Sequence, residues 1–212
     1  LNAIGIQGAV ITIHPFLFKP SWQEMAALSW DEKLARLRDP AVRDRIVKEP
    51  NLWPQSDILE FLQAVSEGWG MQFEMDPDFN YEPTMDESVA ARSSQTNRSP
   101  AEYAYDLLMK DDGKGFIYFP ILNYRDGNLD FLEDLQEASD TVNSLSDGGA
   151  HCGTICDAAS PTFMLQHWVR DRKKARVSLE LAIKRQCRDT ALLYGLADRG
   201  LLAAGYLADL NI

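Results

Sequence analysis

The sequence predicts an α/β fold whose strand–helix units are separated by a long helical segment, and three observations support this. First, "IGIQGAVITI" at 4–13 is a short apolar run rich in branched residues, which predicts a buried strand. Second, helix-start signals recur from about 21 to 110. Third, strand and helix patterns alternate after 110, which is typical of βα units with a parallel sheet.

The helical segment is predicted from four capping boxes, in which Ser or Thr stands three residues before Glu. They are "SWQE" at 21–24, "SWDE" at 29–32, "TMDE" at 84–87 and "SPAE" at 99–102. In this motif the hydroxyl accepts a backbone N–H and the carboxylate accepts the N–H of the cap. Between these signals, 68–83 has no helical period and is predicted to be an irregular, aromatic-rich loop.

After 110 the predicted elements alternate. A strand is predicted at 116–122, an amphipathic helix at 129–138 and a further strand at 141–145; two helices follow at 163–174 and 178–193.

Composition limits the function classes. The chain has 212 residues and 32 acidic against 21 basic side chains, a net charge of -11. An acidic protein is a poor general ligand for nucleic acid, because phosphate binding needs a positive surface. The basic run "RDRKKAR" at 170–176 is expected to be the solvated end of a helix rather than an anion site.

Cysteine usage and chain ends add little to this. Three cysteines, Cys152, Cys156 and Cys187, make no disulfide framework, so a reducing cytoplasm is expected. No apolar run approaches the ~20 residues of a membrane span, so no membrane partner is expected. The chain begins at Leu1 and both ends lie in strand-like runs, so we expect a piece cut from a longer protein.

The stretch "SLSDGGAHCGTICDA" at 144–158 concentrates reactive side chains on a glycine-rich turn. Asp147 follows the strand predicted at 141–145, and catalytic residues of parallel sheets stand at the carboxyl ends of strands. The alternative is a plain turn, in which Asp147 caps the backbone while Gly148 and Gly149 take positive φ.

Several segments together resemble a known family. "LSDGGAHCGTICDAASPTFMLQHWVRDR" and "RQCRDTALLYGLADRGLLAAGYLADLNI" resemble the strand-8 region, and the passage after it, of the N-acyl-D-amino-acid deacylase (D-aminoacylase) branch of the amidohydrolase superfamily. "HPFLFKPSWQEM", "LRDPAVRDRI" and "LLMKDDGKGFIYFPILNYRDGNLD" extend the resemblance over most of the chain, with the weakest part around 50–100.

The resemblance implies the C-terminal part of a metal-dependent hydrolase (β/α)8 TIM-like barrel with a largely helical insertion. It implies a barrel strand at 1–15, a helical insertion or lid over the active site at 16–112, the last βα units at 113–200, and the start of the return to a β-sandwich at 201–212. Four strand candidates instead of eight, in a fold of typically ~250 residues, agree with a partial barrel.

The resemblance also implies a chemistry. A divalent metal, usually zinc, would activate water, and Asp147 would take the water proton and deliver it to the departing amide nitrogen. Gly148 and Gly149 would let the backbone approach the substrate. His151 is a candidate contact to substrate or to Asp147, although a loop histidine is commonly solvated.

The metal ligands themselves are not identified. The chain has no H-x-H motif, and His14 lies too late in the family order, so the ligands are expected upstream and this chain alone is expected to bind no metal. Cys152 and Cys156 lack a second pair of ligands for structural zinc. Cys187 is expected to be a small core residue.

One departure from the family concerns the substrate carboxylate. After Asp147 the chain has "CGTICDAASP" where well-characterised members carry further His and Arg, and the next arginine is Arg170. Arg170 or Arg172 could bind the carboxylate, or both could be surface charges of a helix.

Three functions follow as hypotheses. The first is hydrolysis of a linear N-acyl amino acid. The second is hydrolysis of a cyclic amide such as a hydantoin or dihydropyrimidine, and the third is a non-catalytic truncated remnant. The expected partner is a small-molecule amide. Self-association is also expected, because an incomplete sheet exposes strand edges.

Overall fold

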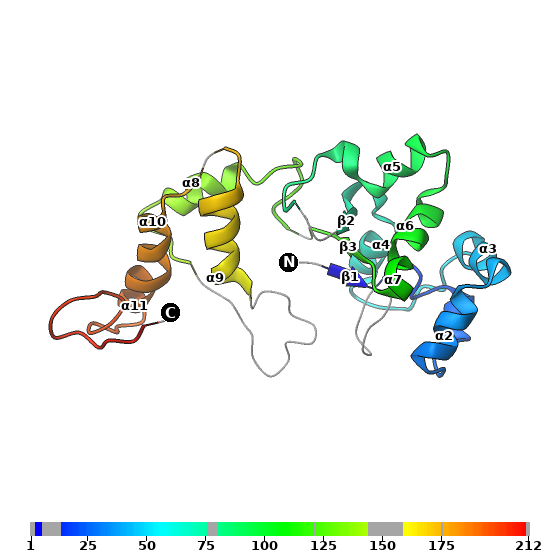
Figure 1. Cartoon of the computed structure of the whole chain (residues 1–212), viewed down its shortest axis with the longest axis horizontal. Coiled ribbons are helices and arrows are strands. Elements are labelled where there is room, and N and C mark those ends of the chain that lie inside the picture. The colour runs from blue at the N-terminus through cyan, green and yellow to red at the C-terminus, as the bar shows by residue number, and fades with distance from the viewer. Residues whose placement is uncertain are drawn as a thin grey trace. The chain divides into compact units, whose positions relative to one another are not determined.

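The computed structural model describes residues 3–5, 14–75, 80–120, 122–143, 159–174 and 176–210. The chain divides into two units, Leu1–Asn128 and Leu129–Ile212, and each is described by itself. Figure 1 labels most of the helices and the strands. Among the described residues, no helix combines the length and the apolar character needed to cross a membrane.

The first unit is mainly helical, as predicted for 21–110. Its elements are α1 (Pro20–Gln23), α2 (Trp30–Leu37), α3 (Pro40–Lys48), α4 (Leu59–Glu67), the 3-10 turns η1 (Trp69–Met71) and η2 (Met85–Glu87), α5 (Val89–Gln95), α6 (Pro100–Leu108) and α7 (Lys110–Gly113).

Three of the four predicted capping boxes are confirmed. Ser29 with Glu32 starts α2, and Ser99 with Glu102 starts α6, with Pro100 at the first helical position. The hydrogen bonds from Ser29 and Ser99 lower the pKa of the Glu32 and Glu102 carboxyls. Thr84 with Glu87 forms the same motif but starts only the single turn η2.

The capping box predicted at 21–24 is wrong. Helix α1 begins at Pro20, so Ser21 lies inside the helix and does not cap it. Its N–H and hydroxyl donate instead to the Glu49 carboxylate, at 2.9 and 2.8 Å. Proline suits the first helical position because an N–H there would have no acceptor within the helix. A residue 28 positions away in the sequence thus decides the role of Ser21.

The described strands form a small antiparallel sheet. Its strands are β1 (Ala3–Gly5), β2 (Phe73–Met75) and β3 (Phe116–Tyr118), in the order β1-β3-β2. β3 falls within the predicted strand 116–122, and β1 overlaps the predicted strand 4–13 at residues 4 and 5; residues 6–13 lie outside the described residues. The central Ile117 pairs with Ile4 on one side and Glu74 on the other.

The predicted parallel pairing is therefore wrong for these strands, and a closed barrel is not seen among the described residues. β2 also lies in the stretch predicted to be an irregular loop. Phe73 is buried and its ring lies 6.3 Å from that of Tyr118 on β3. This contact joins residues far apart in the sequence, which a local pattern does not reveal.

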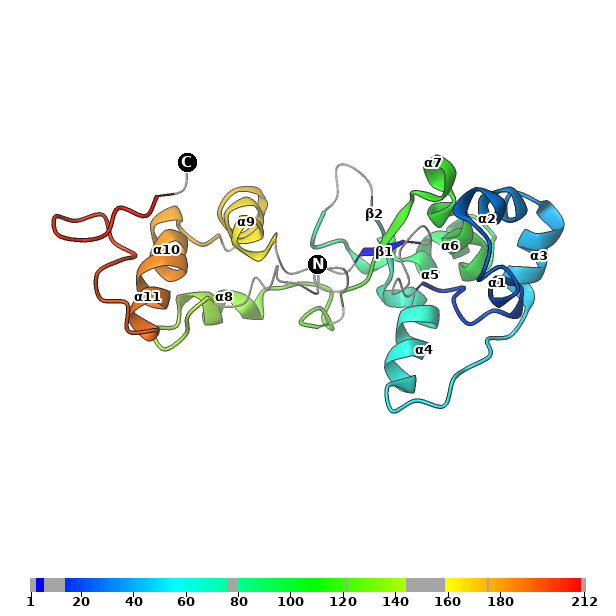
Figure 2. The ribbon, with the colours of Figure 1, turned by 90° about the horizontal axis from the view of Figure 1, so that it is seen from below.

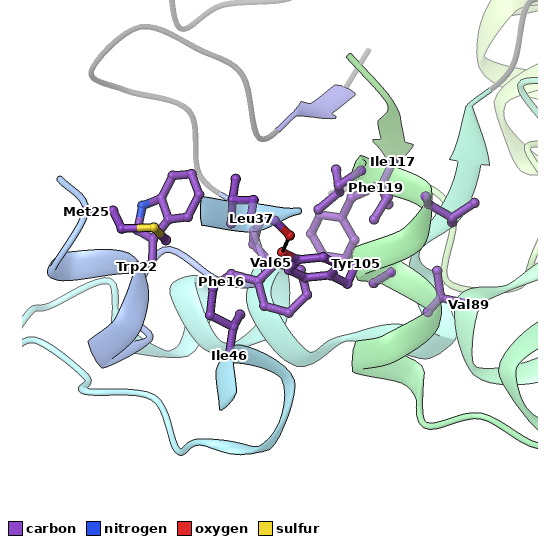
Figure 3. Close-up of a cluster of buried hydrophobic side chains, with 13 residues drawn as sticks. Phe16, Trp22, Met25, Leu37, Ile46, Val65, Val89, Tyr105, Ile117 and Phe119 are labelled. Atoms are coloured by element: carbon purple, nitrogen blue, oxygen red, sulfur yellow. Dashed lines mark hydrogen bonds between the residues drawn. The ribbon is translucent and has the colours of Figure 1, made fainter. Parts of the chain in front are cut away.

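The interior of the first unit is a continuous apolar cluster (Figure 3). Phe16 packs edge-to-face on Tyr105, with ring centroids 5.4 Å apart. The Tyr105 hydroxyl donates to the Leu37 carbonyl at 2.6 Å, so its polar end is satisfied inside the core. The fully buried members of the cluster include Phe16, Ile46, Val89, Ala104, Leu108 and Ile117.

The described elements of the second unit are helices, joined and followed by non-helical segments (Figure 2). Its described elements are α8 (Phe131–Glu137), α9 (Ser160–Phe163) continued by the π-helical η4 (Met164–Asp171), and α10 (Leu179–Lys184) continued by the π-helical η5 (Arg185–Asp189) and by α11 (Thr190–Leu193). These confirm the helices predicted at 129–138, 163–174 and 178–193.

The strand predicted at 141–145 is wrong for residues 141–143, which belong to no strand; 144 and 145 lie outside the described residues. The carbonyls of Thr141 and Asn143 accept hydrogen bonds from the side chains of Arg185 and Thr190. Because side chains donate to these carbonyls, the backbone at 141–143 is bonded without a neighbouring strand.

Candidate active site

The predicted site residues Asp147, Gly148, Gly149 and His151 lie outside the described residues, as do Cys152 and Cys156. The structure does describe the chain on both sides of them. We call 137–143 the upstream stem and 159–163 the downstream stem. Both stems contact the helix formed by α10, η5 and α11.

Arg185 holds the upstream stem. It is 4% exposed, and its Nη1 donates to the Thr141 carbonyl at 2.5 Å. Its Nη2 donates to the Glu137 carbonyl at 3.2 Å and also to that of Ala138. One turn later, Asp189 forms an ion pair with Nη1 of Arg185 at 3.4 Å. The guanidinium thus joins one helix to the end of another.

Thr190 adds a second attachment. Its hydroxyl lies 3.1 Å from the Asn143 carbonyl and 2.8 Å from the Arg185 carbonyl. The Thr141 hydroxyl donates back to the Leu135 carbonyl at 2.6 Å. The stem is therefore bonded up to Asn143, the last described residue before Asp147.

The downstream stem is attached to the same helix. Nε2 of Gln186, the neighbour of Arg185, donates to the Pro161 carbonyl at 3.1 Å. Pro161 lies in the first turn of α9. One helix therefore contacts the chain before and after the stretch that carries Asp147.

The helix that continues from the downstream stem carries contacting aromatic side chains. His167 is buried, with its ring stacked on Phe163 at 4.9 Å and at the edge of Trp168 at 5.9 Å. The guanidinium of Arg172 lies 4.5 Å from the centre of the Trp168 ring. These contacts fix the face of η4 that packs inside the unit.

The basic run 170–176 divides into two kinds of residue. Arg170, Lys173, Lys174 and Arg176 are exposed, as predicted for a solvated helix end. Arg172 is 3% exposed, so that prediction is wrong for it. Arg172 contacts the Asp130 carboxylate at 2.5 Å, and Lys174 contacts the same group. The hydrogen bond from Lys174 is the main cause of the lowered pKa of Asp130.

In the first unit, His14 has the surroundings of a core histidine. It is 1% exposed; its Nδ1 accepts the Phe16 N–H at 3.2 Å and its ring meets the edge of Trp22 at 4.4 Å. Burial, with a contribution from the Lys33 charge, lowers the pKa of His14 to about 3. The imidazole is thus neutral at pH 7.

Among the residues that the structure describes, no group of three or more His, Cys, Asp or Glu side chains could hold a metal ion. The described residues do not by themselves fit a metal centre. Cys187 is exposed, so its prediction as a core residue is wrong. Its helix buries Ala182, Arg185 and Ala191 instead.

Sequence reasoning did not find Arg185, Gln186 or Thr190. The one local signal is "RQCRDT" at 185–190, where Arg185 and Asp189 stand one helical turn apart. Nothing local points to carbonyl acceptors more than 40 positions earlier.

Comparison with known proteins agrees with the resemblance at the family level. A family model described as "Amidohydrolase family" matches residues 12–212. No curated protein and no solved structure matches the chain.

Proposed function

The chain belongs to the amidohydrolase family, and we propose that it works as part of a metal-dependent hydrolase that cleaves a linear amide C–N bond. The proposed substrate is an N-acyl-D-amino acid, which water converts to a carboxylate and a D-amino acid. The observation that carries the proposal is the "SDGGAH" motif at 146–151, which follows a stem bonded to Arg185 and Thr190.

In this proposal Asp147 moves one proton. Its carboxylate accepts the proton of the attacking water as the new C–O bond forms. It then returns that proton to the amide nitrogen as the C–N bond breaks, so the residue ends as it began. Gly148 and Gly149 would give the substrate close access to the backbone, and His151 would contact substrate or Asp147. The metal ligands are proposed to lie outside the described residues.

A cyclic amide is the second candidate substrate, and one observation favours it. Residues 148–158 contain no arginine that could bind a substrate carboxylate. The buried Arg172 is engaged with Asp130 and the Trp168 ring. A hydantoin or dihydropyrimidine ring needs no carboxylate partner.

The test is an assay of the complete gene product, supplied with zinc, on N-acyl-D-amino acids, their L forms, hydantoins and dihydropyrimidines. We expect turnover of the N-acyl-D-amino acids. Hydrolysis restricted to the cyclic amides would replace the first candidate by the second. If none of these substrates is turned over, the remaining hypothesis is a non-catalytic truncated remnant.

The role of Asp147 is tested in the same protein. Asp147→Asn should lower kcat by about 10² to 10⁴ while bound metal is unchanged, because proton transfer contributes a factor of that size. Asp157→Asn, in the same segment, is the matched control and should retain turnover. Equal losses in both variants would count against Asp147.

A further inference from the structure

We draw no further inference here: the strongest candidate, the surface of exposed apolar side chains on α11 and the segment that follows it in the second unit, which includes Leu192, Leu193 and Leu202, carries no proposal because nothing in the structure shows what covers it.

Discussion

Different interactions stabilise the interiors of the two units. In Leu1–Asn128 the interior is a cluster of aliphatic and aromatic side chains around Phe16, Leu108 and Tyr105. In Leu129–Ile212 two of the buried side chains are arginines. Arg172 contacts Asp130 and Trp168, and Arg185 contacts the backbone of the upstream stem.

The second unit also leaves many large apolar side chains exposed, with exposed fractions from 44% to 80%. They are Phe131, Leu135, Leu179, Ile183, Leu192, Leu193, Tyr194, Leu196, Leu201, Leu202, Leu207 and Leu210. Apolar burial is non-directional and scales with area, whereas a guanidinium–carbonyl contact depends on geometry. The described interior of the first unit is thus mainly apolar, whereas that of the second combines buried apolar side chains, such as Met164 and Val177, with directional bonds of arginine. The self-association expected from the strand edges of an incomplete sheet stays a prediction.

The largest effect is expected from breaking the core of the first unit. Phe16→Ala should lower its free energy of unfolding by about 3–5 kcal/mol, because the substitution leaves a cavity in a fully buried cluster. Leu202→Ala in the second unit, where the side chain is 80% exposed, should change stability by less than about 0.5 kcal/mol. Denaturant unfolding, monitored by hydrogen exchange in each unit, measures the change in unfolding free energy of both variants. Similar losses would mean that the units do not differ as described.

Acidification should act on the first unit through His14. Its pKa in the folded state is about 3, below the ordinary 6.5, so the unfolded chain takes up the proton first. The stabilisation is complete above pH 6.5 and is lost as the pH falls from 6.5 towards 3, by about 1 kcal/mol per pH unit. Unfolding free energies measured from pH 7 to 4 give this slope.

His14→Asn is the control for that slope. It offers an acceptor oxygen to the Phe16 N–H but cannot be protonated in this range. The variant should therefore show a shallower dependence on pH. An equally steep slope would assign the acid sensitivity to the carboxylates.

A smaller effect is expected from removing the Tyr105 hydroxyl, which donates a hydrogen bond inside the cluster. Tyr105→Phe leaves the buried Leu37 carbonyl without its donor and should cost about 1–3 kcal/mol. Tyr103→Phe, at a half-buried position of the same helix, should cost less than about 0.5 kcal/mol. Thermal unfolding of the two variants compares them; equal melting temperatures would contradict a role for the hydrogen bond.

The smallest effect is expected at a helix start. Ser99→Ala removes the hydroxyl that caps α6 and should cost about 1 kcal/mol, whereas Ser99→Asp keeps an acceptor and should cost less. Denaturant midpoints of the two variants test this. A larger loss in Ser99→Asp would show that the capping geometry is not what stabilises the helix.

The candidate site was only partly accessible from the sequence. The motif around Asp147 and the family resemblance were visible in the order of residues. The amidohydrolase family is confirmed, whereas the D-aminoacylase branch stays a prediction. The roles of Arg185 and Gln186 were not, because their acceptors at Thr141 and Pro161 lie 44 and 25 positions away. Arg172 was predicted to be solvated because its neighbours are charged, yet Asp130 and Trp168 enclose it.

The sequence by itself determined the helix starts at Ser29, Thr84 and Ser99, because a capping box is completed within four residues. It also determined the helices around 131–137 and 179–193, whose apolar period is local. Only the tertiary structure decided the antiparallel order β1-β3-β2, the strand at Phe73–Met75 and the bonding of Ser21 to Glu49. Each of these depends on a partner distant in the sequence, whose position becomes defined only when the chain folds.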